Sequence, residues 1–358
     1  MTALADDPLS ALFYNPAGLS DTPGENAQIG TGIYEFPVVY RSPDGISTEN
    51  TFLSKAPYFG YSNDRFDPIF WGIGMYGSTG TGFEYDRDVE HGLYHKSTAE
   101  LGNVYLSPTF AYKIDDRLSV GAGLNITYGL LKMGMPLSIN STDKLDIDID
   151  GFSLGVNVGV LYKPTQYMSL GVRWRSRIKS ELNGDAEVFG LKDDVTAYLY
   201  WPDVLTFGVG INLTTKLIFL CDYEWIDYSR FSNKSRFSYD TLTYLNGPFI
   251  TDMRDAFRIH AGFEYTLNEI IVLRAGYLYN RWCIPIDQMA PLAPGNTYHT
   301  PHLGIEWKLN ESIDLDVSGF RNFHKQREVS YSETGYPGIY NTPSHGIEIE
   351  VTYHFRKD

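Results

Sequence analysis

The chain has 358 residues, of which 43% are hydrophobic and 15% aromatic, and its formal net charge at pH 7 is -15. This acidic balance argues against nucleic-acid binding, because a phosphate backbone needs a basic surface. No run of about 18 apolar residues is present, which excludes a membrane-spanning helix. The length fits two ordinary domains or one large β-barrel, and the 27 tyrosines and 6 tryptophans favour a barrel with rings at water–lipid boundaries.

The N-terminal segment is apolar but irregular. Asn15-Pro16 interrupts the apolar run 11–20, because proline supplies no backbone donor and biases the preceding residue away from helix. We expect residues 1–26 to form a bent plug that is buried against the barrel, and residues 27–358 to form that barrel. Residues 1–7 lack the basic start and apolar core of a secretory signal, so we expect a mature or truncated chain.

After the plug, short polar turns recur about every fifty residues, at 62–65, 114–117, 163–166, 213–216, 267–269 and 309–311. Longer polar segments lie between them, and this asymmetry is typical of outer-membrane barrels with tight periplasmic turns and longer external loops. The pattern predicts an all-β fold, a fourteen-stranded antiparallel transmembrane barrel. The expected strands are 27–41, 49–62, 67–84, 98–114, 117–135, 146–163, 167–183, 196–213, 216–229, 253–267, 270–283, 297–309, 312–328 and 341–355.

Alternation within the strands indicates which face meets lipid. The even residues from Phe152 to Tyr162 are apolar, and the residues between them are small or polar. The stretch 257–265 and the last strand, 347–355, alternate in the same way. A soluble sandwich would also alternate, with its apolar face turned inward. We favour the barrel because the chain offers no second set of elements to cover so much apolar surface.

The polar faces carry both signs of charge, which predicts ion-pair ladders across the lumen. On a sandwich the same residues would form a solvated surface. The residues expected to form the ladders come from strands seven, nine and ten: Arg173, Arg175, Asp222, Glu224, Arg258 and Glu264.

Several dispersed segments resemble the FadL/TodX (OmpP1) family of outer-membrane transporters for long-chain fatty acids and other hydrophobic compounds. Asn15-Pro16-Ala17 is similar to the family's plug, or hatch, and 70–80 is similar to its third strand. The order and spacing of further segments agree: 174–184, 201–203, 223–231 and 255–258. The family's plug is longer on its N-terminal side, so the plug here is expected to be truncated. The external loops 85–97 and 136–146 are also short.

The resemblance implies passive transport of hydrophobic molecules, with lateral exit through a gap in the barrel wall. It places the protein in the Gram-negative outer membrane as a monomer in contact with outer-membrane lipid and lipopolysaccharide. No catalytic residue, cofactor, metal or nucleic acid is expected. The residues implied in gating are Phe13, Tyr14, Asn15, Pro16 and Ala17. Those implied in a third-strand kink and lateral opening are Tyr76, Gly77, Gly80 and Gly82.

Two other functions remain open from the sequence: a general diffusion porin or structural barrel, and a lipid hydrolase or acyltransferase. The second lacks a convincing serine, histidine and acid set. The third strand contains a formal G-x-G-x-x-G from Gly72 to Gly77, but no helix start follows it, as a dinucleotide site would require. Its glycines indicate instead a bulge or kink, or relief of crowding against the plug.

Four further patterns are weak. Gly151 to Gly155 matches the G-x-S-x-G of hydrolases, yet it sits in clean strand alternation rather than in an elbow. The run 146–151 imitates a calcium loop without its final glutamate, and His91 and His95 lack further ligands. Cys221 and Cys283 fall on non-adjacent strands, so no disulfide is expected. Pro57 and Pro108 are expected to mark bulges.

Overall fold

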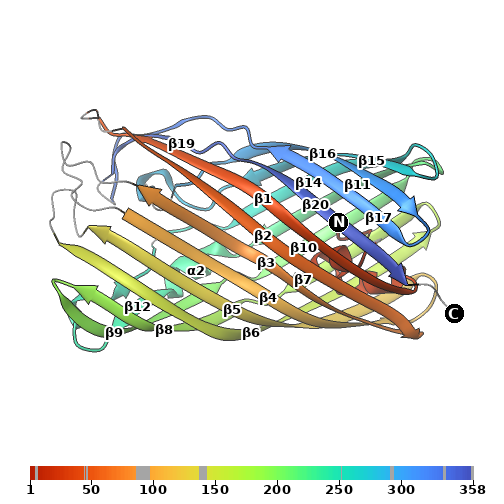
Figure 1. Cartoon of the computed structure of the whole chain (residues 1–358), viewed down its shortest axis with the longest axis horizontal. Coiled ribbons are helices and arrows are strands. Elements are labelled where there is room, and N and C mark those ends of the chain that lie inside the picture. The colour runs from red at the N-terminus through yellow and green to blue at the C-terminus, as the bar shows by residue number, and fades with distance from the viewer. Residues whose placement is uncertain are drawn as a thin grey trace.

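A computed structural model describes residues 1–355 except 5–6, 44, 46, 86–96, 137–142, 251, 291–293 and 334–335. Its strands form one continuous antiparallel sheet that closes on itself as a barrel (Figure 1). The closing seam joins β1 to β20, with Glu25 opposite Phe355 and Glu35 opposite His345. A closed sheet has no second layer, so the sandwich alternative is excluded.

Sixteen segments make up the barrel wall, and two pairs of them continue one another, so the described residues form the fourteen predicted barrel strands. The segments are β1 (Glu25–Arg41), β2 (Ser47–Phe66), β3 (Ile69–Tyr85), β4 (Ser97–Lys113), β5 (Leu118–Pro136), β6 (Lys144–Thr165), β7 (Met168–Arg175), β8 (Ile178–Val188), β9 (Leu191–Trp201), β10 (Val204–Asn212), β11 (Leu217–Ile226), β14 (Ala256–Thr266), β15 (Ile271–Arg281), β16 (Tyr298–Asn310), β17 (Ile313–Arg321) and β20 (His345–Phe355).

The predicted strands 167–183 and 196–213 are wrong as continuous elements. Each breaks in the middle, the first between β7 and β8 and the second between β9 and β10. Below the breaks β7 pairs with β10, whereas above them β8 and β9 form a hairpin whose outer edge pairs with β12. Pro202 lies in the second break, where it removes a backbone donor from the ladder.

The long connections lie at one end of the barrel and contain the remaining elements. They are α2 (Tyr228–Lys234), β12 (Arg236–Tyr239), η3 (Thr243–Leu245), β13 (Gly247–Pro248), η4 (Ile286–Gln288), β18 (Arg327–Val329) and β19 (Gly338–Asn341). The tight turns and the end of β20 lie at the opposite end, on the right in Figure 1, and the N-terminus lies inside the barrel toward that end. By the usual asymmetry of outer-membrane barrels, the tight turns are periplasmic and the long connections external.

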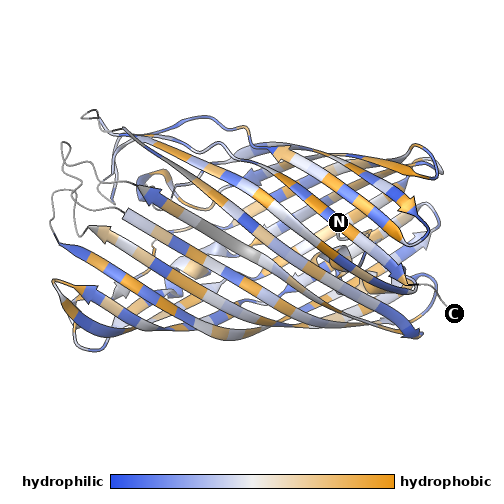
Figure 2. Ribbon diagram, viewed as in Figure 1, coloured by the Kyte–Doolittle hydropathy of each residue, from blue (hydrophilic) through white to orange (hydrophobic). Residues whose placement is uncertain are grey.

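The outer face of the wall is apolar, as the alternation predicts. Phe152 and Leu154 on β6 are 75% and 64% exposed, and Ile347 and Ile349 on β20 are also exposed. The residues that alternate with these exposed positions face the lumen, and several of them, such as Asn157 on β6, are polar and buried. Figure 2 shows apolar and polar residues alternating along the strands. Among the described residues no helix is long and apolar enough to cross a membrane.

The bulges expected at the two prolines are wrong. Pro57 stays in register opposite Thr31 of β1, and it lies beyond the last residue of β2 that pairs with β3. Pro108 pairs with Ile73 of β3, and the β4–β5 ladder is interrupted beside it without a shift of register. At both positions the strand has no hydrogen-bonded neighbour on one side. The proline, which has no N–H to donate, is therefore tolerated there and the strand stays in register.

Candidate functional site

The lumen is occupied at its periplasmic end by the N-terminal segment, which we call the plug (residues 1–24). It contains α1 (Pro8–Tyr14) and the 3₁₀ helix η1 (Pro16–Asp21). Asp7 caps α1 by accepting a hydrogen bond from the Ser10 N–H at 2.7 Å, and Pro8 takes the first helical position, where no donor is needed. Figure 1 shows this segment inside the barrel.

Asn15 joins the two helices of the plug and fixes it to the wall. Its extended backbone ends α1, and its carboxamide oxygen accepts from the Ala17 N–H at 3.1 Å to start η1. Its amide nitrogen donates to the carbonyl oxygen of Thr2 at 2.8 Å and to that of Val160 on β6 at 3.1 Å. Asn15 is fully buried, so these bonds satisfy a side chain that would otherwise be costly to bury.

Glycines on the inner wall leave room for the plug backbone. A methyl group on Gly121 would lie 2.5 Å from the Ala17 nitrogen, and one on Gly159 would lie 2.9 Å from Pro16 Cδ. On β7, a methyl group on Gly171 would lie 2.6 Å from the carbonyl carbon of Thr2. The sequence analysis missed this seat, although glycine recurring at inward positions of successive strands was the available signal.

Two buried arginines hold the end of α1. Arg173 Nη1 donates to the carbonyl oxygen of Phe13 at 2.8 Å, and Arg175 Nη2 donates to the same oxygen at 3.2 Å. The guanidinium of Arg175 also lies over the Phe13 ring, 4.9 Å from its centroid. Cations at a helix C-terminus complement its exposed carbonyls and dipole. The arginines therefore fasten this end of the plug to β7.

Three of the six predicted ladder residues form one network. Glu224 on β11 accepts from Arg173 at 2.9 Å and from Arg258 on β14 at 3.0 Å. Asp222 does not join this network by an ion pair but accepts from the Thr2 N–H of the plug at 2.8 Å. Among the described residues, these charged side chains therefore connect the wall to the plug as well as connecting neighbouring strands to each other.

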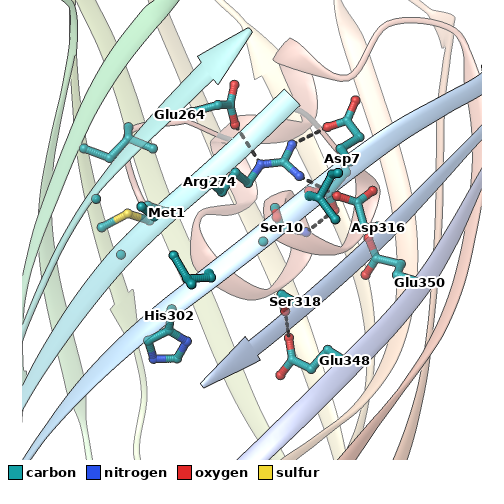
Figure 3. Close-up of a pocket in the computed structure, with 18 of the residues that line it drawn as sticks. Met1, Asp7, Ser10, Glu264, Arg274, His302, Asp316, Ser318, Glu348 and Glu350 are labelled. Atoms are coloured by element: carbon teal, nitrogen blue, oxygen red, sulfur yellow. Dashed lines mark hydrogen bonds and ion pairs between the residues drawn. The ribbon is translucent and has the colours of Figure 1, made fainter. Parts of the chain in front are cut away.

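Glu264 belongs to a separate cluster centred on Arg274 of β15. Arg274 pairs with Glu264 at 2.9 Å and with Asp316 of β17 (Figure 3). It also pairs with Glu306 of β16. This cluster borders a cavity of about 580 Å³ between the plug and the wall from β14 to β20. The acidic residues that line the cavity are Asp7, Glu264, Glu306, Asp314, Asp316, Glu348 and Glu350, against two permanent cations, Arg274 and Lys308.

The third strand is irregular at the residues predicted to form a lateral opening. The register of β3 against β4 shifts between Gly77 and Thr79. The ladder between β2 and β3 stops at the pair Phe59 and Met75, although β3 stays paired with β4 as far as Tyr85. We call the described stretches 47–58 and 76–85, which face each other without pairing, the β2–β3 seam. The two ribbons diverge there toward the external end (Figure 1).

Two aromatic side chains, Phe52 and Tyr76, have described contacts at the seam. A methyl group on Gly82 would lie 2.6 Å from Cζ of the Phe52 ring, so the Phe52 side chain from β2 covers Gly82 on β3. Tyr76 is buried and packs edge-on against Phe13 of the plug, with ring centroids 5.2 Å apart. Gly80 pairs with Gly102 of β4. Closer to the plug, Leu12 fills the space beside the inward-facing Gly74, which is the crowding relief considered above.

Above the plug, the inner wall of β6, β8 and β9 is apolar. The buried cluster there contains Tyr76, Tyr105, Leu131, Ile147, Ile149, Ile178, Leu182, Leu199, Trp201, Phe231, Tyr239 and Leu242. Phe13 packs against it from the plug, and Tyr58 packs against it from the β2 side of the seam. The apolar cluster is therefore continuous with both the plug and the β2–β3 seam.

The G-x-S-x-G match has a structural explanation. Past the break after β7, the wall bends into the lumen and Ile178 packs over Gly155, where a methyl group would lie 2.6 Å from Ile178 Cγ1. The backbone of Glu181 packs over Gly151 in the same way. Between the two glycines, the Ser153 hydroxyl donates to the Ser180 hydroxyl at 2.9 Å. The two glycines of the motif make room for the bent neighbouring strand, and Ser153 lies within a strand rather than at the sharp turn that a catalytic serine needs.

The remaining sequence patterns gather no site among the described residues. Cys221 and Cys283 are both free thiols. Asp146 and Asp148 face outward on β6 and pair with Lys144 and Lys132. No metal-binding group is found within the described ranges. His91, His95 and most of the loops 85–97 and 136–146 lie outside those ranges.

Comparison with known proteins identifies the fold and the family. A family model described as "Outer membrane protein transport protein (OMPP1/FadL/TodX)" matches residues 2–355. The chain belongs to this family. FadL/TodX proteins are outer-membrane transport proteins rather than enzymes, and this chain is accordingly a barrel of the Gram-negative outer membrane.

Two curated relatives support the family assignment. Outer membrane protein P1 of Haemophilus influenzae is 25% identical over 321 residues, covering 76% of this chain and 65% of that protein. The long-chain fatty acid transport protein of Escherichia coli is 22% identical over 329 residues, covering 79% of this chain and 72% of that protein. The match therefore spans about two thirds of the length of the Haemophilus protein.

Solved FadL/TodX structures share the whole architecture. A FadL homologue of Pseudomonas aeruginosa superposes with a TM-score of 0.87 at 16% identity, covering 99% of this chain and 96% of that one. The toluene transporter TodX of Pseudomonas putida gives a TM-score of 0.84 at 16% identity, with 100% and 96% covered. At this identity the likeness establishes the fold alone.

Proposed function

We propose that this FadL/TodX protein carries hydrophobic molecules, such as long-chain fatty acids or aromatic hydrocarbons, inward across the outer membrane by passive diffusion. The molecules leave the lumen sideways through the β2–β3 seam and enter the bilayer. The observation that carries the proposal is the end of the β2–β3 ladder at Phe59 and Met75, directly beside the plug and the apolar cluster. The concentration gradient and consumption inside the cell drive the flow.

The polar cavity argues for a sideways exit. A hydrophobic molecule that continued past the plug would have to cross the acid-lined space around Arg274. Keeping apolar surface wet costs roughly 25 cal/mol per Å², so a ligand with about 200 Å² of apolar surface would lose about 5 kcal/mol on that route. The seam is lined instead by Phe52 and Tyr76, and it leads toward lipid.

The predicted gating residues receive specific roles in this proposal. Phe13 forms the floor of the apolar cluster through its contacts with Tyr76 and Arg175. Asn15, Pro16 and Ala17 hold that floor in place through the bonds to Val160 and the glycine seat. Tyr14 packs edge-on against Phe13, with ring centroids 4.9 Å apart. Below the seam the described wall strands pair with a neighbour on both sides, which supports action as a monomer.

Bulky residues in the seam test the exit route. Replacing both Gly80 and Gly82 by leucine is expected to reduce uptake of a radiolabelled long-chain fatty acid and of toluene at least fivefold, in cells that lack their own transporters. The side chain at position 82 would fill the space between β3 and the Phe52 ring. Gly276→Leu on the opposite wall, where the nearest atoms to an added methyl lie 3.7 Å away, is the matched control. Unchanged uptake in the double variant removes the seam mechanism, and no uptake by the wild type removes the transport proposal itself.

A diffusion porin is the second candidate, and the polar cavity beside the plug is the observation in its favour. The plug opposes it, because α1 and η1 occupy the lumen and contact strands from β1 to β6. A large, steady ionic current through the unmodified protein would favour the porin. The transport proposal expects only a small current.

A further inference from the structure

A group of cationic and aromatic side chains lies on the outer surface of the external hairpin. The ammonium of Lys179 on β8 lies 5.0 Å from the ring centroid of Tyr198 on β9. The guanidinium of Arg236 on β12 lies 5.5 Å from the same centroid, and Arg236 is the direct ladder partner of Tyr198. We call Lys179, Tyr198 and Arg236 the external cation site.

The strand alternation places this site on the outside of the molecule. Val195, Ala197, Leu199 and Trp201 are buried in the apolar cluster, so the residues between them point the other way. Tyr239 of β12 is buried in the same cluster, and alternation therefore turns Arg236 outward as well. Both Lys179 and Arg236 are exposed.

The two cations differ from their neighbours in having no carboxylate partner. Arg177 pairs with Asp203 at 3.2 Å, and Arg230 pairs with Asp227 at 3.5 Å. Within the described residues, neither Lys179 nor Arg236 makes an ion pair, although the exposed Glu181 is the ladder partner of Tyr198. In a chain of net charge -15, two unpaired cations beside one ring form a local site of the opposite sign.

The height of the site corresponds to the lipid headgroups. On the neighbouring β6 the outward residues change from the exposed apolar Phe152 to the acidic Asp150. Asp150 is the ladder partner of Asn183 on β8, and Tyr198 pairs with Glu181, two residues before Asn183, so the external cation site lies beside this boundary. Aromatic rings of barrels mark the membrane interface, and the layer above them is polar headgroup.

We propose that the external cation site binds the phosphate groups of an anionic glycolipid in the outer leaflet. Lys179 and Arg236 lie on the two strands that flank β9, one on each side of Tyr198. Each cation can therefore give charge-assisted hydrogen bonds to a phosphate group, and arginine matches phosphate oxygens in pairs. The Tyr198 ring holds both cations at one place and faces the lipid with an amphipathic surface. The inference concerns the lipid around the barrel and is independent of what the lumen transports.

The test compares lipids and variants in parallel. Purified full-length protein is titrated with bis-phosphorylated lipid A, with enzymatically dephosphorylated lipid A and with inorganic phosphate, and native mass spectrometry measures bound ligand. The wild type is expected to bind the phosphorylated lipid about tenfold more tightly than the dephosphorylated one. The double variant Lys179→Gln/Arg236→Gln is expected to lose this tenfold preference.

Two controls keep the result specific. Lys216→Gln removes an exposed cation from a periplasmic turn and is expected to leave the preference intact. The charge-retaining variant Lys179→Arg/Arg236→Lys is expected to restore most of it, and heat-modified migration on gels checks that every barrel is folded. Equal binding of both lipids by the wild type, or an unchanged preference in the Gln variant, overturns the proposal. Saturation of the site by inorganic phosphate alone at similar affinity overturns its assignment to lipid.

Discussion

At the scale of single residues, glycine determines how closely the plug can approach the wall. Gly121, Gly159 and Gly171 lie on three different strands. Gly121 and Gly171 leave space for backbone atoms of the plug, and Gly159 leaves space for the Asn15 carboxamide and the Pro16 ring. Backbone atoms cannot rotate away as the end of a side chain can, so an added side chain must move the whole segment. The seat is therefore more sensitive to substitution than the exposed lipid-facing residues are.

The seat predicts a specific defect in one variant. Gly121→Val is expected to cost about 1–3 kcal/mol of plug docking, because overpacking against a rigid contact forces backbone shifts. Hydrogen exchange of the amides of residues 11–20 is expected to rise at least tenfold, while the amides of the wall strands stay protected. Gly276→Val is the control, since its added methyl has only ordinary contacts. Equal exchange in wild type and Gly121→Val would show that the plug does not depend on the seat.

At the scale of elements, the external hairpin β8–β9 is fixed by one carboxylate. Asp193 on β9 accepts hydrogen bonds from the N–H groups of Thr241 and Leu242, the latter at 2.7 Å. These backbone donors, that of Leu242 foremost, hold the pKa of the Asp193 carboxyl below its ordinary value. The carboxylate thereby fastens the connection after β12 to the hairpin.

This contact predicts a dependence on pH. Because the pKa of Asp193 is lower in the folded protein, its stabilisation is present above the unfolded pKa of about 3.9 and is lost as the pH falls through the folded value. Asp193→Asn is expected to speed hydrogen exchange of the Thr241 and Leu242 amides severalfold at pH 7. The exposed neighbour Asp194→Asn serves as the control. Identical protection in both variants would contradict the role of Asp193.

Sequence patterns predict most elements of this fold but not how neighbouring strands meet. Alternation and turn spacing are local properties, and they predict fourteen strands and the lipid-facing side. The break after Arg175 has no glycine or proline to mark it, and alternation runs on through it. The convergence of Arg173, Glu224 and Arg258 follows from outward–inward alternation, whereas the pairing of Glu264 with Arg274 depends on the register between β14 and β15. The glycine seat depends on contacts between distant parts of the chain.

At the scale of the whole molecule, the plug sits off-centre in the lumen. It packs closely on the wall near Gly121, Gly159 and Gly171, and the acid-lined cavity separates it from the wall between β14 and β20. The outer surface is apolar along the middle of the barrel, and the inner surface changes from apolar at the external end to charged beside the plug. The lumen therefore offers an apolar environment to hydrophobic solutes at its external end and a charged environment to hydrated solutes beside the plug.

The charge of the cavity predicts the sign of any residual ionic current. A space whose charged lining residues are mostly carboxylates concentrates cations, so single channels in planar bilayers are expected to show a small, cation-selective conductance. Glu348→Gln together with Glu350→Gln is expected to shift the reversal potential in a potassium chloride gradient toward zero. Glu311→Gln on an exposed periplasmic turn is the control. Anion selectivity in the unmodified protein would contradict the role of the cavity.

The glycine seat also has a consequence for the order of assembly. The plug precedes the wall strands in the chain, yet its docking surface includes strands much later in the sequence, with Gly159 and Gly171 among the residues that contact it. Contacts of such long sequence separation form slowly, because a large loop must close before they are gained. We therefore expect the first residues of the chain to be among the last to reach their native positions, after the middle of the cylinder has formed around them.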